Sequence, residues 1–136
     1  MKELKLAYSK WLPFKGFYAL TLFGTVIRRE KYKGIKLDTV TQNHEGIHVC
    51  QAEDFIRPKK PNKFINFLNY IMFYILYGLE WFMKALMSLF TGFKIKAYCS
   101  ISFEQEAHNN EYNFNYQDNR NRYAWTQYIG KLVWKK

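Results

Sequence analysis

The feature that most constrains the fold is an apolar run at positions 64–79, FINFLNYIMFYILYGL, which is sixteen residues long and ends before Glu80. A helix that spans a membrane needs about 20 mostly apolar residues, so this run is short for a span and long for a surface helix. We expect a long aromatic helix over about 62–91, or two helices that join near Gly78.

Basic residues are abundant in this chain, and one cluster of them directly precedes the apolar run at 64–79. The chain has 21 Lys and Arg against 11 Asp and Glu, a net charge of +10, and two basic clusters occur at 28–36 and 57–63. A basic patch beside an aromatic-rich helix is typical of a helix at a membrane surface. The alternative is a solvated loop that leads into a buried helix. We favour the buried helix, and the alternative partner is an anionic membrane surface.

The composition limits the class of protein. A chain of 136 residues predicts a single domain over 1–136, and a content of 49% hydrophobic residues excludes a disordered chain. Two cysteines are too few for a disulfide scaffold, and the N-terminus lacks an apolar run of signal-peptide length, so we expect a cytoplasmic protein that could associate with membranes. No sequence signature of a nucleic-acid-binding fold is present, and we expect no nucleic-acid partner.

The pattern along the chain predicts an α+β fold, mostly helical, with a small N-terminal β-sheet or hairpin. Apolar residues alternate over 17–28, which predicts a strand. Helices are expected over about 100–114 and from about 119–122 onward, the last with Trp125 on its apolar side.

A further helix is expected from about 38 to 54. Thr39 and Gln42 fit a capping box at its start, and Asp38 suits the first turn, where the helix dipole favours negative charge.

This helix contains the sequence His44-Glu45-Gly46-Ile47-His48. Residues four apart lie on one helical face about one turn apart, so both imidazoles can bind the same zinc ion. Glu45 lies about 100° around the helix from His44, where it can reach a water on that ion and act as general base. Gly46 costs helix stability, by about 1 kcal/mol relative to Ala, which suggests that another group approaches there.

A catalytic zinc commonly has three protein ligands and a water, so a third ligand is expected later in the chain. The sequence SFEQEAHNNE offers Glu104 and Glu106, which are about 200° apart on a helix, so only one of them can face the metal. Both flank the apolar side by similar angles, and periodicity does not choose between them. His108 is a rival ligand of another type.

Other candidates are weaker. Gln51 follows His44 by seven residues on the same helical face, where it could touch the substrate, support a ligand or simply pack. A peptidase also needs a donor for the tetrahedral oxyanion, and such donors are available late in the chain: Tyr112, Tyr116, Arg120 and Tyr123.

The motif His44-Glu45-x-x-His48 followed by Glu104-x-x-Ala107 resembles the gluzincin metallopeptidases. The sequence is similar to the CAAX-type membrane endopeptidases, to the soluble minigluzincins, and to small bacterial HExxH proteins that share the run SFExEA. The resemblance implies a zincin-like fold with Glu104 as third ligand and a strand above the site that can pair with an extended peptide. It departs from the CAAX-type pattern at His108, where that pattern has Asp.

The sequence therefore predicts a zinc metallopeptidase of a gluzincin-like class, acting on peptides or protein tails. Glu45 is the expected catalytic base, and His44, His48 and Glu104 are the expected metal ligands, with Glu106 as the alternate third ligand. No other cofactor is expected. The alternative function is a membrane-surface or protein-interaction module with a structural or vestigial metal site.

Overall fold

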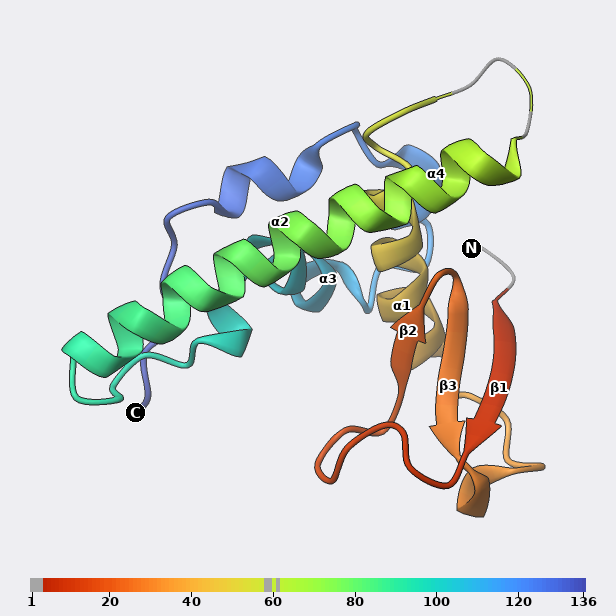
Figure 1. Cartoon of the computed structure of the whole chain (residues 1–136), viewed down its shortest axis with the longest axis horizontal. Coiled ribbons are helices and arrows are strands. Elements are labelled where there is room, and N and C mark those ends of the chain that lie inside the picture. The colour runs from red at the N-terminus through yellow and green to blue at the C-terminus, as the bar shows by residue number, and fades with distance from the viewer. Residues whose placement is uncertain (1–3, 58–59, 61) are drawn as a thin grey trace.

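The computed structural model describes residues 4–57, 60 and 62–136 (Figure 1). It has the expected α+β architecture, with a small sheet near the N-terminus followed by helices. The strands are β1 (Lys5–Ser9), β2 (Leu20–Leu22) and β3 (Thr25–Arg29), and the α-helices are α1 (Thr39–Ala52), α2 (Lys63–Phe90), α3 (Ser102–Asn110) and α4 (Tyr116–Asn119). Three short 3₁₀ helices also occur among the described residues: η1 (Glu30–Tyr32), η2 (Tyr98–Ser100) and η3 (Ala124–Tyr128).

The sheet has the order β1-β3-β2, with β1 parallel and β2 antiparallel to β3. The prediction of a single strand over 17–28 was wrong, because a tight turn divides this segment into a hairpin. Phe23 and Gly24 both have positive φ, 49° and 74°, as the two central residues of a hairpin turn require. The turn leaves β2 at an edge of the sheet, beside α2.

Helix α1 begins at Thr39, as the start expected at about residue 38 predicted. Asp38 is the N-cap, and its carboxylate accepts a hydrogen bond from the Thr41 amide at 2.9 Å. The predicted capping box of Thr39 and Gln42 was therefore placed one residue too late. α1 carries the His44–His48 motif and packs against both α3 and β2.

Helix α2 is continuous over 28 residues and does not break at Gly78. Its inner face is fixed by polar contacts: Asn69 binds the backbone of Ile56 in both directions, and Glu80 accepts hydrogen bonds from Ser102. Only 17% of its most apolar window is buried. The expectation of a buried helix was therefore wrong for most of this segment, and α2 is long and apolar enough to cross a membrane by length and composition.

The C-terminal region covers the other side of the core. The core cluster contains Ala52, Phe73, Ile101 and Phe103, and the ring of Trp125 packs on Phe103 at 4.4 Å between centroids. The prediction of one last helix was wrong. The chain forms α4 and η3, separated by Arg120–Tyr123, and then continues without regular secondary structure apart from an isolated bridge between Ile95 and Trp134. The helix predicted over 100–114 is the shorter α3.

Candidate functional site

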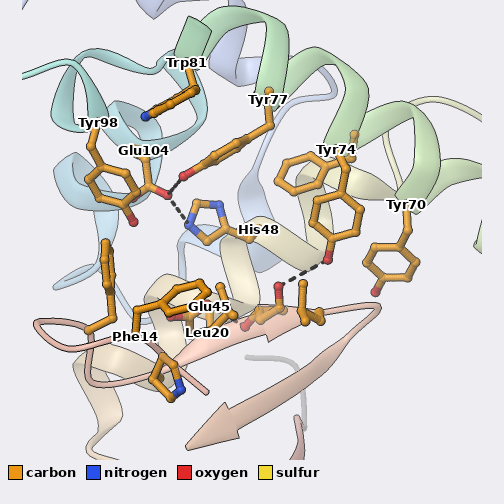
Figure 2. Close-up of a pocket in the computed structure, with 17 residues that line it drawn as sticks. Phe14, Leu20, Glu45, His48, Tyr70, Tyr74, Tyr77, Trp81, Tyr98 and Glu104 are labelled. Carbon is orange, nitrogen blue, oxygen red and sulfur yellow. Dashed lines mark hydrogen bonds and ion pairs between the residues drawn. The ribbon is translucent and has the colours of Figure 1, made fainter. Parts of the chain in front are cut away.

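The two histidines of α1 meet a carboxylate from α3. Nε2 of His44 and Nε2 of His48 are 3.2 Å apart. Oε1 of Glu104 lies 3.3 Å from Nε2 of His48, and Oε2 lies 3.5 Å from Nε2 of His44. Figure 2 shows the contact between His48 and Glu104. Three groups that can each donate a lone pair therefore converge on one point between α1 and α3.

The spacing of these atoms fits a tetrahedral zinc site. Ligand atoms about 2.0–2.1 Å from a tetrahedral zinc lie roughly 3.4 Å from one another, close to the separation of the two Nε2 atoms and to the distance from each Nε2 to one oxygen of Glu104. Glu104 is only 2% exposed, and its Oε2 atom is buried without a hydrogen-bond donor among the described residues. A buried carboxylate oxygen of this kind is costly unless a cation neutralises it.

His108 lies at the exposed side of the same cluster. Ligand atoms of His44, Glu104 and His108 all lie within 4.8 Å of one another, so this group could also hold a metal ion. Nε2 of His108 is 3.8 Å from Glu104 Oε2, but the side chain is 49% exposed. His108 is therefore placed to contact an ion from the solvent side, whereas His44, His48 and Glu104 form the buried part of the cluster.

The charges around His48 favour a cation. Burial lowers the pKa of His48, but the carboxylates of Glu104 and Glu45 outweigh that effect and raise it to about 9. Burial raises the pKa of Glu104, whereas His48 and His44 hold it well below its ordinary value. The cluster thus carries an excess of negative charge when both histidines are neutral, which is the condition that attracts a divalent ion.

Hydrogen bonds at the far nitrogens hold both imidazoles in place. Nδ1 of His44 donates to Glu111 Oε2 at 2.8 Å, and Nδ1 of His48 donates to Gln51 Oε1 at 2.8 Å. In the neutral form of each ring, which a bound metal requires, this leaves Nε2 as the lone-pair atom that faces Glu104. Such contacts orient the ligands of protein-bound zinc and raise their basicity. Gln51 thus has the supporting role that its helical spacing allowed. Glu111 was missed, although it is the last residue of the run SFEQEAHNNE that was searched for the third ligand.

Glu106, the alternate third ligand, faces a different partner. Its carboxylate is fully buried and accepts hydrogen bonds from Arg120, with Nε to Oε1 at 2.5 Å and Nη2 to Oε2 at 3.0 Å. Tyr116 and Gln51 donate to the same carboxylate, each at 3.0 Å. Arg120 also pairs with the buried Asp54. Glu106 is therefore the centre of a structural network, and its oxygens point away from the two Nε2 atoms.

Glu45 lies on α1 between the two histidines and faces β2. Its Oε2 accepts a hydrogen bond from the Thr21 hydroxyl at 2.5 Å. The hydroxyl of Tyr74 on α2 donates to the Thr21 carbonyl at 3.2 Å and accepts from the Phe23 amide at 2.9 Å. β2 is thereby tied to both helices, and the Glu45 side chain has a fixed direction.

A cavity of about 400 Å³ opens beside this carboxylate (Figure 2). Glu45, His48 and Glu104 are the carboxylate and imidazole groups of its lining, and most other lining groups are aromatic or aliphatic. The lining comes from the loop before β2, from β2 itself, and from one stripe of α2 that contains Tyr70, Tyr74, Tyr77 and Trp81. The cavity is an apolar space that ends at the proposed ligands and base.

Two tyrosines at the inner end of the cavity were missed by the sequence reasoning. The Tyr77 hydroxyl donates to Glu104 Oε1 at 2.8 Å, and Tyr98 lies beside it (Figure 2). Burial and the neighbouring Glu104 raise the pKa values of both phenols far above the ordinary range, so both stay protonated donors. The spacing of Tyr70, Tyr74 and Tyr77 on one helical stripe was the available signal.

The predicted oxyanion donors lie elsewhere. Tyr112 is 73% exposed, and Tyr116 and Arg120 are bound to Glu106. Neither these residues nor Tyr123 are among the described residues that line the cavity.

Gly46 has a close neighbour, as we expected from the helix stability that a glycine at this position costs. A Cβ atom at this position would lie 2.4 Å from the amide nitrogen of Gln117. That amide donates to the side chain and backbone oxygens of Asn43 at 2.7 and 3.2 Å. The glycine thus allows α4 to pack directly on the helix that carries the histidines.

Comparison of the chain with models of protein families finds no match, and searches of curated proteins and of solved structures find none either. The functional argument therefore depends on the geometry of the site.

Proposed function

We propose that this protein is a zinc-dependent hydrolase of peptide bonds, with His44, His48 and Glu104 as metal ligands and Glu45 as general base. The observation that carries the proposal is the convergence of the two Nε2 atoms, 3.2 Å apart, with the Glu104 carboxylate, whose Oε1 lies 3.3 Å from His48 and whose Oε2 lies 3.5 Å from His44. A second carboxylate, that of Glu45, lines an open cavity beside them. These are the parts of a metal-assisted hydrolysis: a ligand set, a proton acceptor and a place for the substrate.

When bound, zinc polarises a carbonyl and lowers the pKa of a coordinated water. The residues of the chain supply the remaining steps. Glu45, oriented by Thr21, accepts a proton from the attacking water and delivers it to the amine that leaves. The Tyr77 hydroxyl donates to Glu104 and so helps to position that ligand, and the protonated Tyr98 hydroxyl beside it is the candidate hydrogen-bond donor to the substrate at this end of the cavity.

Substrate binding is assigned to β2 and the cavity. β2 is an edge strand whose residues Leu20–Leu22 line the cavity, so an extended peptide can lie along it there. A bulky apolar side chain suits the aromatic lining, whereas a charged one would lose its hydration there.

The experiment compares the wild-type chain with Glu45→Gln after both are loaded with zinc. Metal content by mass spectrometry and hydrolysis of a peptide library are measured on the same samples. We expect about one zinc in each protein, and hydrolysis in the wild type that falls roughly a hundredfold or more in Glu45→Gln, since a general base commonly contributes 10²–10⁴-fold. Full activity in Glu45→Gln would contradict the proposal.

A different result would favour the alternative function. If both proteins bind zinc but neither cleaves any peptide, the metal has a structural or vestigial role. If neither binds zinc after reconstitution, the histidine pair is not a metal site.

A further inference from the structure

Helix α2 has an outer face made of large apolar side chains. Its members are between 38% and 86% exposed: Phe64, Phe67, Met72, Ile75, Leu76, Leu79, Trp81, Phe82, Met83, Met87, Leu89 and Phe90. At about 1.5 Å per residue, a helix of 28 residues extends for roughly 42 Å. Figure 1 shows α2 crossing the molecule as one straight rod. Exposed apolar surface of this extent marks an interaction site.

No charged side chain interrupts the outer face. Between Phe64 and Phe90 the ionisable groups that carry charge at neutral pH are Glu80 and Lys84. Both point inward: Glu80 accepts from Ser102, and Lys84 is 5% exposed and donates to the Lys131 carbonyl at 3.0 Å. The helix has therefore placed its few charges on the protein side and left the outer side apolar.

Basic residues lie at both ends of this face. Arg57, Lys60 and Lys63 are exposed at the start of α2, and Lys94 and Lys96 are exposed just beyond its end. An apolar helical face flanked by cations fits the surface of an anionic lipid bilayer, where the side chains enter the acyl region and the cations stay with the headgroups.

We propose that the outer face of α2 docks on an anionic membrane, with the helix lying in the plane of the bilayer surface. A spanning orientation would expose the inner face to lipid and remove the partners of Asn69, Glu80 and Lys84. A second copy is a poorer occupant. Two outer faces pressed together would bring basic ends against basic ends in either direction, which is repulsive.

The docked orientation also defines where the cavity opens. The stripe of α2 that lines the cavity includes Trp81, which is 48% exposed and belongs to the outer face as well. The opposite rim carries Phe14 and Phe17, which are 69% and 48% exposed. The mouth of the cavity therefore borders the docked surface, and molecules held at the membrane surface are within its reach. The docking itself does not depend on hydrolysis.

The test uses the purified full chain and vesicles of phosphatidylcholine alone or in equimolar mixture with phosphatidylglycerol. Wild type should sediment with the anionic vesicles more than with the neutral ones, and added salt should weaken this binding. The double variant Leu79→Gln/Phe82→Gln should lose roughly tenfold or more in apparent affinity, because two apolar side chains no longer enter the lipid. Both residues are more than half exposed, so the fold should persist, as circular dichroism will check.

The control is Leu6→Gln/Ile35→Gln, which replaces two exposed apolar residues away from α2 and should bind vesicles like wild type. Three outcomes would overturn the proposal. They are absent binding to both vesicle types, equal losses in the two double variants, and retention in the membrane after alkaline carbonate extraction, which would indicate a spanning helix. A concentration-dependent dimer that Leu79→Gln/Phe82→Gln abolishes, without vesicle binding by wild type, would assign the face to a second copy instead.

Discussion

The Nδ1 atom of His48 donates to Oε1 of Gln51 at 2.8 Å, and the amide of the same Gln51 donates to Glu106 at 3.0 Å. Glu106 is in turn held by Arg120, and Arg120 by Asp54. A largely buried chain of polar contacts thus connects the C-terminal segment with a proposed metal ligand. It fixes which nitrogen of His48 faces the ligand cluster.

This connection predicts that Gln51→Met weakens zinc binding although Gln51 is not a ligand. Methionine keeps the length of the side chain but neither accepts from Nδ1 nor donates to Glu106. Loss of a partner of this kind commonly lowers metal affinity by 10–100-fold, and we expect roughly tenfold. Zinc affinity is measured by competition with a chromogenic chelator, and Gln42→Met on the same helix serves as the control. Equal affinities in the two variants would remove Gln51 from the site.

The two candidate carboxylates predict opposite phenotypes. Glu104→Gln should lose zinc and keep the fold, because it removes a proposed ligand. Glu106→Gln should keep zinc at saturating concentration but lower the free energy of unfolding by about 3 kcal/mol, since Arg120 would lose a buried anionic partner. Metal content and urea unfolding of both variants decide the matter. The reverse pattern would transfer the ligand role to Glu106.

The choice between these two glutamates shows where sequence reasoning ends. Both side chains are buried, and both flank the apolar side of α3. What separates them is Arg120, fourteen residues further along the chain, which pairs with Glu106. Periodicity describes one helix and contains nothing about such a partner. The pairing of His44 with His48 could be predicted because a spacing of four residues is local to α1.

The same limit explains the errors in the sheet and in α2. The alternation over 17–28 was real, but the turn depends on Phe23 adopting a positive φ, which few non-glycine residues do. The length of α2 followed from its apolar run and from the end at Thr91. Whether its apolar side is covered depends on the amount of remaining chain, and among the described residues most of the large apolar side chains on this side stay exposed. Hydropathy alone does not contain that information.

The contact between Thr21 and Glu45 predicts a variant that loses hydrolytic activity but keeps its zinc. Thr21→Val preserves the shape and strand propensity of the residue but removes the hydroxyl that orients the proposed base. A hydrogen bond to a charged group contributes about 1.5–3 kcal/mol, so the rate of peptide hydrolysis should fall roughly tenfold or more. Zinc content should be unchanged. Thr25→Val, on the neighbouring β3, is the matched control. Loss of zinc in Thr21→Val would instead show that β2 supports the ligands.

The last prediction concerns the start of α1, which positions every proposed site residue on that helix. Asp38→Ala should lower the free energy of unfolding by about 1 kcal/mol at neutral pH, the usual effect of losing an N-cap, and Thr39→Ala should change it little.

Partial burial raises the pKa of Asp38, but hydrogen bonds from Thr41 outweigh it and hold the pKa below the ordinary value of 3.8. The folded state therefore binds this proton less readily than the unfolded chain does. The stabilisation from the charged carboxylate is complete above the unfolded pKa and is lost as the pH falls through the folded one. Urea unfolding at neutral pH and at decreasing acid pH should show the difference between wild type and Asp38→Ala shrinking below about pH 4. A difference that stays constant into strong acid would mean that the charge of Asp38 does not stabilise α1.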